Sequence, residues 1–256
     1  MMWSLIKLRR WRVVMAALLL APGAPLCAQQ VPLQVQPVRF QVRAWSDGVA
    51  SATLALGSAV PSLLGDRLPM ASCAPCDPSQ LWGIDRGSVG AVRSGPEMAS
   101  NVALMATVGG SALLVAVTRR GEPRALDAVL EDAAVMVQAA ALDGFITQWL
   151  KVAVHRARPE RYTPQGSQFT AVEDSRSFPS GHASFAFAAA AAAASILHRR
   201  GELHRHKVET ILLFAGAAVT SALRVAARQH FPTDVLAGAV LGTAIGWTVP
   251  MLHPVH

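Results

Sequence analysis

Three short stretches of the chain concentrate side chains that bind anions and move protons. The first, KVAVHRARPE at 151–160, places Lys151 and Arg158 seven residues apart. Seven residues are close to two helical turns, so both cations share one face of a helix, and Arg156 falls on another face. Pro159 limits this helix, because the residue before a proline disfavours the helical region. A basic helix end that complements the helix dipole explains the same stretch.

The second stretch is SFPSGHAS at 177–184. Ser180 is a good N-cap, and the free N–H groups of the first helical turn lie just beyond it. A helix N-terminus of this kind binds anions, and Gly181 lets the backbone approach a ligand closely. His182 then lies within reach of the bound group. Alone, this stretch indicates an anion site and nothing more specific.

The third stretch, LRVAARQHFPTDV at 223–235, combines an arginine with a histidine and a carboxylate. Pro232 suits the first turn of a new helix. Asp234 follows His230 by four residues, so its carboxylate can accept a hydrogen bond from one ring nitrogen and leave the other unprotonated. A local His–Asp pair that caps a helix is the alternative.

Together the three stretches predict a phosphate site without a metal or other cofactor. Lys151, Arg158 and Arg224 supply three positive charges, and Ser180 and Gly181 supply hydroxyl and backbone donors. Asp234 is the one carboxylate of the set, too few for magnesium or a zinc pair. A tetrahedral oxyanion such as phosphate fits these donors best. On these grounds either histidine could be the nucleophile or the proton donor.

The elements that position these residues are predicted to be helices. Hydrophobic residues make up 52% of the 256 and charged residues 15%, against roughly 45–50% and 25% in soluble domains. Six long segments carry little or no charge: 48–64, 98–118, 133–150, 183–197, 210–223 and 235–252. They predict an all-α bundle of about six helices. Two of these helices separate the second stretch from the third, which returns the chain to the same end of the bundle.

The same helices favour an integral membrane protein, with a soluble periplasmic bundle as the alternative. A membrane-spanning helix needs about 20 apolar residues. Segment 98–118 reaches that length, 133–150 and 235–252 are borderline, and 183–197 and 210–223 are short. Lys and Arg divide almost evenly between the two ends, so the positive-inside rule only weakly favours one membrane orientation.

The N-terminal region predicts export. Residues 1–28 combine four basic residues with an apolar stretch and small residues, as in a secretory signal peptide or an uncleaved anchor. These four account for much of the net charge of +7, and no basic stripe with aromatics suggests nucleic-acid binding. Residues 29–97 follow as a helix and a loop, and 98–252 as the core. Within the loop, Cys73 and Cys76 predict a local disulfide, with free thiols as the alternative.

In order and spacing, the stretches resemble the signature of the type 2 phosphatidic acid phosphatase (PAP2) superfamily, which includes bacterial class A acid phosphatases and vanadium haloperoxidases. That signature reads Lys-x6-Arg-Pro, then Pro-Ser-Gly-His, then Arg-x5-His-x3-Asp. All three parts occur between 151 and 234. One position departs, because Leu223 stands where the family usually has a serine.

The resemblance implies a role for each residue. His230 would attack phosphorus and form a phosphohistidine, oriented by Asp234. His182 would protonate the leaving alcohol and then activate water. The phosphoryl oxygens would be held by Lys151, Arg158, Ser180, Gly181 and Arg224.

The resemblance also frames the substrate and the rival functions. A lipid phosphate or diphosphate is expected if the site lies at the periplasmic face of a bacterial inner membrane, and a small phosphomonoester if the protein is soluble in the periplasm. A vanadate-dependent haloperoxidase is a weaker alternative, because those chains are generally much longer. A non-catalytic membrane protein is disfavoured, because all six charged and histidine positions of the signature are intact.

Overall fold

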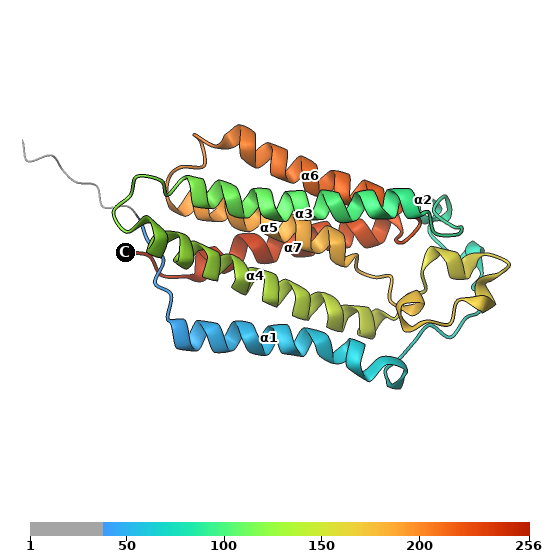
Figure 1. Ribbon diagram of the computed structural model, residues 1–256. Helices are drawn as coiled ribbons and strands as arrows, with labels where there is room; N and C mark the ends of the chain where they lie inside the picture. The colour runs from blue at the N-terminus through green and yellow to red at the C-terminus, as the bar shows by residue number, and fades with distance from the viewer. Residues whose placement is uncertain (1–37) are drawn as a thin grey trace, which may run out of the picture. The chain divides into compact units, whose positions relative to one another are not determined.

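The computed structural model describes residues 38–256, and this part of the chain is all-α (Figure 1). The predicted signal peptide or anchor at 1–28 lies outside the described residues. Six long helices correspond to the six apolar segments: α1 Ala44–Leu64, α3 Ser94–Val117, α4 Ala125–Val154, α5 Gly181–Arg199, α6 Lys207–Ala226 and α7 Pro232–Leu252. Within 38–256, strand-type pairing is limited to an isolated bridge between Phe40 and Val255. The prediction of an all-α bundle of about six helices is confirmed.

Several helices extend beyond their predicted ends, because charged residues do not end them. The clearest case is α4, which begins before its apolar segment and includes Asp132 and Asp143. Asp132 binds Arg119 at 2.8 Å, and Asp143 accepts a hydrogen bond from Ser184 at 2.5 Å. Buried carboxylates are tolerated when they are paired in this way.

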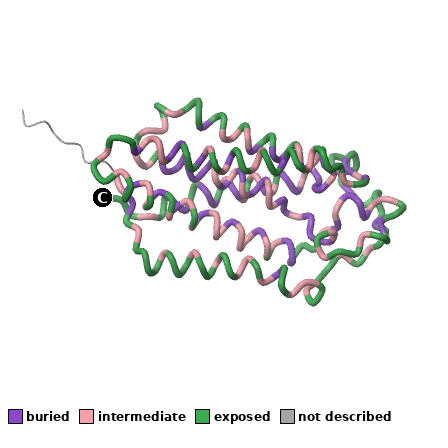
Figure 2. Tube along the Cα trace, viewed as in Figure 1, coloured by how far each residue is buried: buried purple, intermediate pink, exposed green. Residues whose placement is uncertain are grey.

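The alanine-rich helix α5 is the centre of the bundle. It packs against α3, α4, α6 and α7, whereas α1 packs on the outer side of α4. The seven alanines at 188–194 are largely buried, and Figure 2 shows burial concentrated along α5 and α7.

Small residues hold α5 and α7 in backbone contact. On α7, Gly238, Gly242 and Gly246 face α5 at intervals of four residues. A Cβ on Gly242 would lie 2.0 Å from the carbonyl oxygen of Ser184. Such spacing of glycines allows close helix packing. The contact reaches the N-termini of both helices, where the Ser180 amide donates to the Asp234 carbonyl at 3.0 Å.

The connections that follow α1 and α4 contain short elements that the sequence did not predict. They lie at the end of the bundle where α4 ends and α5 begins (Figure 1). The elements are η1 Gly65–Arg67, η2 Pro78–Gln80, α2 Gly83–Arg86, η3 Pro159–Tyr162, η4 Gly166–Gln168 and η5 Val172–Ser175.

Five helical segments are long and apolar enough to cross a membrane: Ala44–Arg67, Ser94–Val117, Gly181–Arg199, Lys207–Ala226 and Pro232–Leu252. Their outer faces expose large apolar side chains, including Met105 and Leu113 on α3, Leu212 on α6 and Val240 on α7. Contiguous exposed apolar surface of this kind is unusual for a soluble monomer. The helices are therefore compatible with a membrane protein.

Candidate active site

The first motif places its lysine inside the bundle, in the last turn of α4. Lys151 is buried, and its Nζ donates to the carbonyl oxygen of Arg176 at 2.9 Å. The helix ends at Val154, and His155 follows in a left-handed conformation with φ 37°. The chain then turns so that the Arg158 amide donates to Asp174 at 2.8 Å. The two cations that the sequence placed on one helical face therefore come from a helix and from the loop after it.

The two arginines of the motifs lie near Lys151 and retain free donors. The charges of Arg158 and Arg224 both act on the Lys151 ammonium group. Arg158 donates from Nη1 to the side-chain oxygen of Gln229, and Arg224 donates from Nη1 to Ser100 Oγ at 3.3 Å. The Nε atoms of both arginines are buried, without a partner among residues 38–256. Buried unpaired donors are costly, so these groups are suited to receive an anion.

Few carboxylates oppose this positive charge. Glu173 lies 3.6 Å from Arg158, but its side chain is 60% exposed to solvent. Burial raises the pKa of Glu160 to about 7, and the neighbouring Asp174 carboxylate adds to the rise. The raised pKa weakens the opposition of the Glu160 carboxylate to Arg158, while the charge of Glu97 acts on Arg224.

The N-terminus of α5 faces the same cluster. Ser180 caps the helix by accepting a hydrogen bond from the Ala183 amide at 3.5 Å. A Cβ on Gly181 would lie 3.9 Å from Cε of Lys151, so the first helical turn and the lysine are in contact range. Backbone donors of a helix N-terminus and a buried ammonium group thus converge, which is favourable for phosphate.

His182 lies in the first turn of α5 and is half-buried. Its Nε2 lies 2.7 Å from the side-chain oxygen of Asn101 on α3. An amide oxygen only accepts hydrogen bonds, so this ring nitrogen carries the proton. Asn101 therefore orients the ring from a helix that contains none of the three motifs.

His230 is buried and neutral, with 1% of its surface exposed. Burial lowers the pKa of the His230 ring to about 3, assisted by the nearby charges of Lys151 and Arg158. Its Nδ1 lies 2.8 Å from the carbonyl oxygen of Ser177, and a carbonyl accepts. Nδ1 therefore carries the proton and Nε2 carries the lone pair, which is the form that a nucleophile requires.

Asp234 contacts His230 differently from the sequence-based expectation. Its Oδ2 lies 3.7 Å from His230 Nδ1, beyond hydrogen-bonding distance. Oδ2 instead accepts from Ser177 Oγ at 2.5 Å and from the Phe231 amide at 3.0 Å. Asp234 thus fixes the residue whose carbonyl orients the ring and the residue that follows the ring in the chain.

Sequence reasoning missed the partners of the motif residues. Arg156 was assigned no role, although it lies within the first motif; Gln229 directly precedes His230, and Ser177 lies two positions before Pro179. Position next to a motif was the signal that could have identified these three. Asn101 and Ser100 belong to another helix and gave no such signal.

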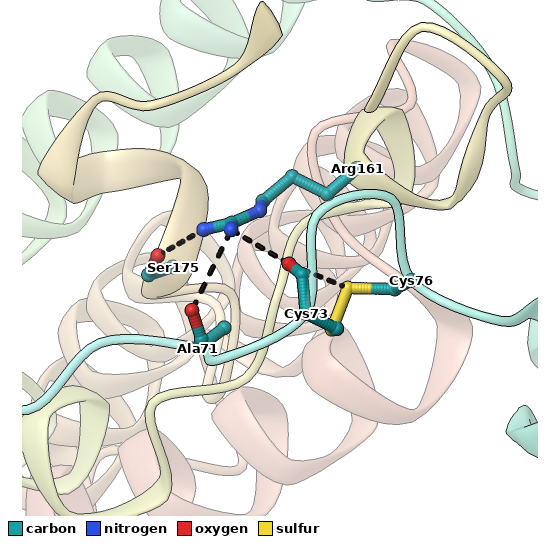
Figure 3. Close-up of a disulfide and its surroundings, with 5 residues drawn as sticks. All are labelled: Ala71, Cys73, Cys76, Arg161 and Ser175. Atoms are coloured by element: carbon teal, nitrogen blue, oxygen red, sulfur yellow. Dashed lines mark hydrogen bonds between the residues drawn. A yellow bond between two sulfur atoms is a disulfide. The ribbon is translucent and has the colours of Figure 1, made fainter. Parts of the chain in front are cut away.

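The cysteine pair lies beside the loop that carries Arg158. Cys73 and Cys76 are joined by a disulfide, as Figure 3 shows. The Arg161 guanidinium donates to the Cys73 carbonyl at 2.7 Å and to Ser175 Oγ at 2.5 Å (Figure 3). Arg161 therefore links the disulfide loop to Ser175, near the other end of the connection from η3 to η5.

Comparison with known proteins agrees with this geometry. The family model described as PAP2 superfamily matches residues 132–255, a span that contains all three motifs. This match places residues 132–255 of the chain in the PAP2 superfamily. No solved structure was found to match it. For a PAP2 chain, the motif residues that meet at one end of the bundle form the candidate active site.

Proposed function

We propose that this PAP2 chain is a metal-independent phosphatase that hydrolyses a phosphorylated lipid through a phosphohistidine. The observation that carries the proposal is the cluster of three cations at the N-terminus of α5, of which Lys151 and Arg224 are buried, beside a buried neutral His230. A cluster of cations binds a phosphoryl group directly and disfavours a divalent metal ion at the same place.

In the first step, the lone pair on His230 Nε2 attacks phosphorus and forms a P–N bond. The bond between phosphorus and the ester oxygen breaks, and His182, protonated for this step, transfers a proton to the leaving oxygen. Lys151, Arg158 and Arg224 bind the oxygens on which negative charge grows. Fixed donors aimed at such developing charge commonly supply the largest share of catalysis.

In the second step, water attacks the phosphorus of the phosphohistidine. His182 takes a proton from this water, the P–N bond breaks, and its electron pair returns to His230 Nε2. Inorganic phosphate leaves, and both histidines regain their starting protonation states.

The exposed apolar faces of the helices support a lipid as the substrate. Five helical segments have the length and composition to cross a bilayer, and the site lies at one end of the bundle. A phosphate headgroup at the membrane surface would meet the cations there while its chains remain in the bilayer. We propose that this end faces the periplasm of a bacterial inner membrane.

The test uses full-length protein in detergent. Phosphate release is measured from phosphatidate, a lipid diphosphate and a small soluble phosphomonoester, with and without vanadate. We expect the lipid substrates to be preferred, vanadate to inhibit, and EDTA to have no effect.

His230→Asn should lower kcat by about 10⁴-fold or more, and Arg224→Ala by about 10²- to 10³-fold, while both remain folded.

Three results would redirect the proposal. Preference for the soluble ester would indicate a small-molecule acid phosphatase. Halide oxidation that requires vanadate would indicate a haloperoxidase. An inactive wild-type protein that still binds vanadate would indicate a non-catalytic phosphate-binding protein.

A further inference from the structure

Asp85 is a buried carboxylate that belongs to none of the three motifs. It lies in α2, a single helical turn between the disulfide loop and α3. Its neighbours Trp82 and Ile84 are 74% and 60% exposed, whereas Asp85 is 1% exposed. A carboxylate is buried at considerable cost unless it is paired, so the contacts of Asp85 show what it does.

The Asp85 carboxylate binds the start of α7 and the side chain of Arg156. Oδ1 accepts from the Thr233 amide at 3.1 Å, an N–H of the first turn of α7. Oδ2 accepts from Thr233 Oγ1 at 2.7 Å and from Arg156 Nη2 at 2.8 Å. Asp85 thus caps a helix that begins 147 positions later in the chain and holds an arginine beside it.

Arg156 links Asp85 to the catalytic carboxylate. Its Nη1 donates to Asp234 Oδ1 at 2.6 Å, and its guanidinium lies 4.3 Å from the centre of the Phe231 ring. Both terminal nitrogens of Arg156 are therefore occupied, one by each carboxylate. The arrangement is a row of three charged side chains, Asp85–Arg156–Asp234. Asp85 holds the guanidinium of Arg156, and Arg156 holds the carboxylate of Asp234.

This chain leads to the nucleophile. Asp234 Oδ2 holds Ser177, and the Ser177 carbonyl accepts the Nδ1 proton of His230. If Asp234 moved, Ser177 would lose the contact that holds it, and its carbonyl would no longer select the tautomer of the His230 ring. The charge of Asp85 also matters, because His230 becomes cationic when it is phosphorylated. Asp85, Arg156 and Asp234 together carry a formal charge of −1, which favours a cation on His230, and without Asp85 their formal charge would be zero.

We propose that Asp85 is a positioning residue for phosphoryl transfer: through Arg156 it keeps Asp234 and Ser177 where they hold His230 as the Nδ1–H tautomer. The inference rests on the proposed phosphatase activity. Neither Asp85 nor Arg156 belongs to the predicted phosphate-binding set. Replacing either residue should therefore lower kcat and leave the affinity for phosphate unchanged.

The first experiment measures kinetics of the full-length Asp85→Asn variant, which keeps the shape and removes the charge. We expect kcat to fall by about 10- to 100-fold, as for removal of other residues that orient a reactive group. The inhibition constant for vanadate should stay within about twofold of wild type, since Lys151, Arg158 and Arg224 are untouched. Arg156→Met should give a similar loss, and the double variant should lose no more than Arg156→Met alone.

The matched control is Glu131→Gln. Glu131 pairs with Arg39 at 2.7 Å in a partly buried ion pair that involves no motif residue. Its kcat should equal that of wild type. If Asp85→Asn lowers kcat and vanadate affinity together, along with thermal stability, its role is merely structural and the inference is overturned.

A second measurement does not depend on turnover. Nitrogen-15 NMR of histidine-labelled protein reports the tautomer of His230, assigned with the His230→Asn variant. Wild type should show Nδ1–H alone, and Asp85→Asn a mixture of tautomers. A pure Nδ1–H signal in Asp85→Asn, with kcat as in wild type, would refute the positioning role. If wild type hydrolyses none of the substrates, the proposed function fails, and the NMR result still decides the role of Asp85.

Discussion

At the scale of single residues, His230 shows how burial prepares a nucleophile. An exposed histidine with an ordinary pKa near 6.5 is partly cationic at mildly acidic pH, and its cationic form has no lone pair to donate. Burial beside cations lowers the pKa of His230 to about 3, and the Ser177 carbonyl selects the tautomer with Nε2 free. The same environment makes protonation of the folded protein unfavourable, which links this residue to stability.

The lowered pKa of His230 predicts acid-sensitive stability. Between pH 6.5 and 3 the unfolded chain binds a proton at this position that the folded protein does not bind, so stability falls as the pH falls through this window. At pH 5 the loss is about 2 kcal/mol relative to pH 8. His230→Asn removes this contribution. Thermal unfolding at pH 8 and pH 5 should show a smaller drop in Tm for His230→Asn than for wild type, and an equal drop would contradict the burial effect.

Residue spacing was sufficient to predict which side chains lie together at the candidate site, but not what holds them. Few other kinds of site require a lysine and two arginines at the spacing of Lys151, Arg158 and Arg224. By contrast, Ser177 is 53 positions from His230, and Asn101 is 81 positions from His182. Such contacts depend on how helices pack, which a local pattern does not encode.

At the scale of elements, the close contact of α5 with α7 determines whether the site exists. These helices carry the second motif and the end of the third motif at their N-termini. Apolar periodicity predicted both helices, because long uncharged segments are unambiguous. It could not predict α2 or the short elements of the connections, because single turns lack periodicity and are stabilised by tertiary contacts. The glycines of α7 allow its backbone to approach α5 closely. Whether a glycine does this depends on the helix that packs against it, which a local pattern does not show.

Gly242→Ala should therefore impair the site from a distance. Its Cβ would lie 2.0 Å from the Ser184 carbonyl, so the two backbones must separate. We expect kcat to fall at least about 10-fold and stability by about 1–3 kcal/mol. The matched control is Gly109→Ala on α3, where a Cβ meets nothing within 4 Å and higher helix propensity favours the alanine. Equal kcat in the two variants would show that the close contact does not position the motifs.

At the scale of the whole molecule, the two ends of the described bundle differ in chemistry. At the end with the motifs, Lys151 and Arg224 form no ion pair within residues 38–256, and Arg158 lies 3.6 Å from the largely exposed Glu173. At the other end, Arg119 and Arg200 both bind the buried Asp132, at 2.8 and 3.2 Å. These ion pairs tie the start of α4 to the end of α5. At the motif end, Arg158 and Arg224 keep buried Nε donors without a partner among residues 38–256.

The exposed apolar faces between the two ends predict a membrane protein, and the export signal predicted at 1–28 predicts that its site faces the periplasm. Alkaline extraction of membranes should leave the protein in the pellet, and its release would establish the soluble alternative.

The orientation in the membrane is tested with single cysteines in a Cys27→Ser background. One cysteine replaces Gln168 in the motif-end connection, and another replaces His204 in the loop between α5 and α6; both positions are exposed. An impermeant maleimide should label Gln168→Cys in intact spheroplasts, whereas His204→Cys should react only after lysis. The reverse pattern would place the cation cluster in the cytoplasm, and the substrate would then have to be a lipid of the inner leaflet.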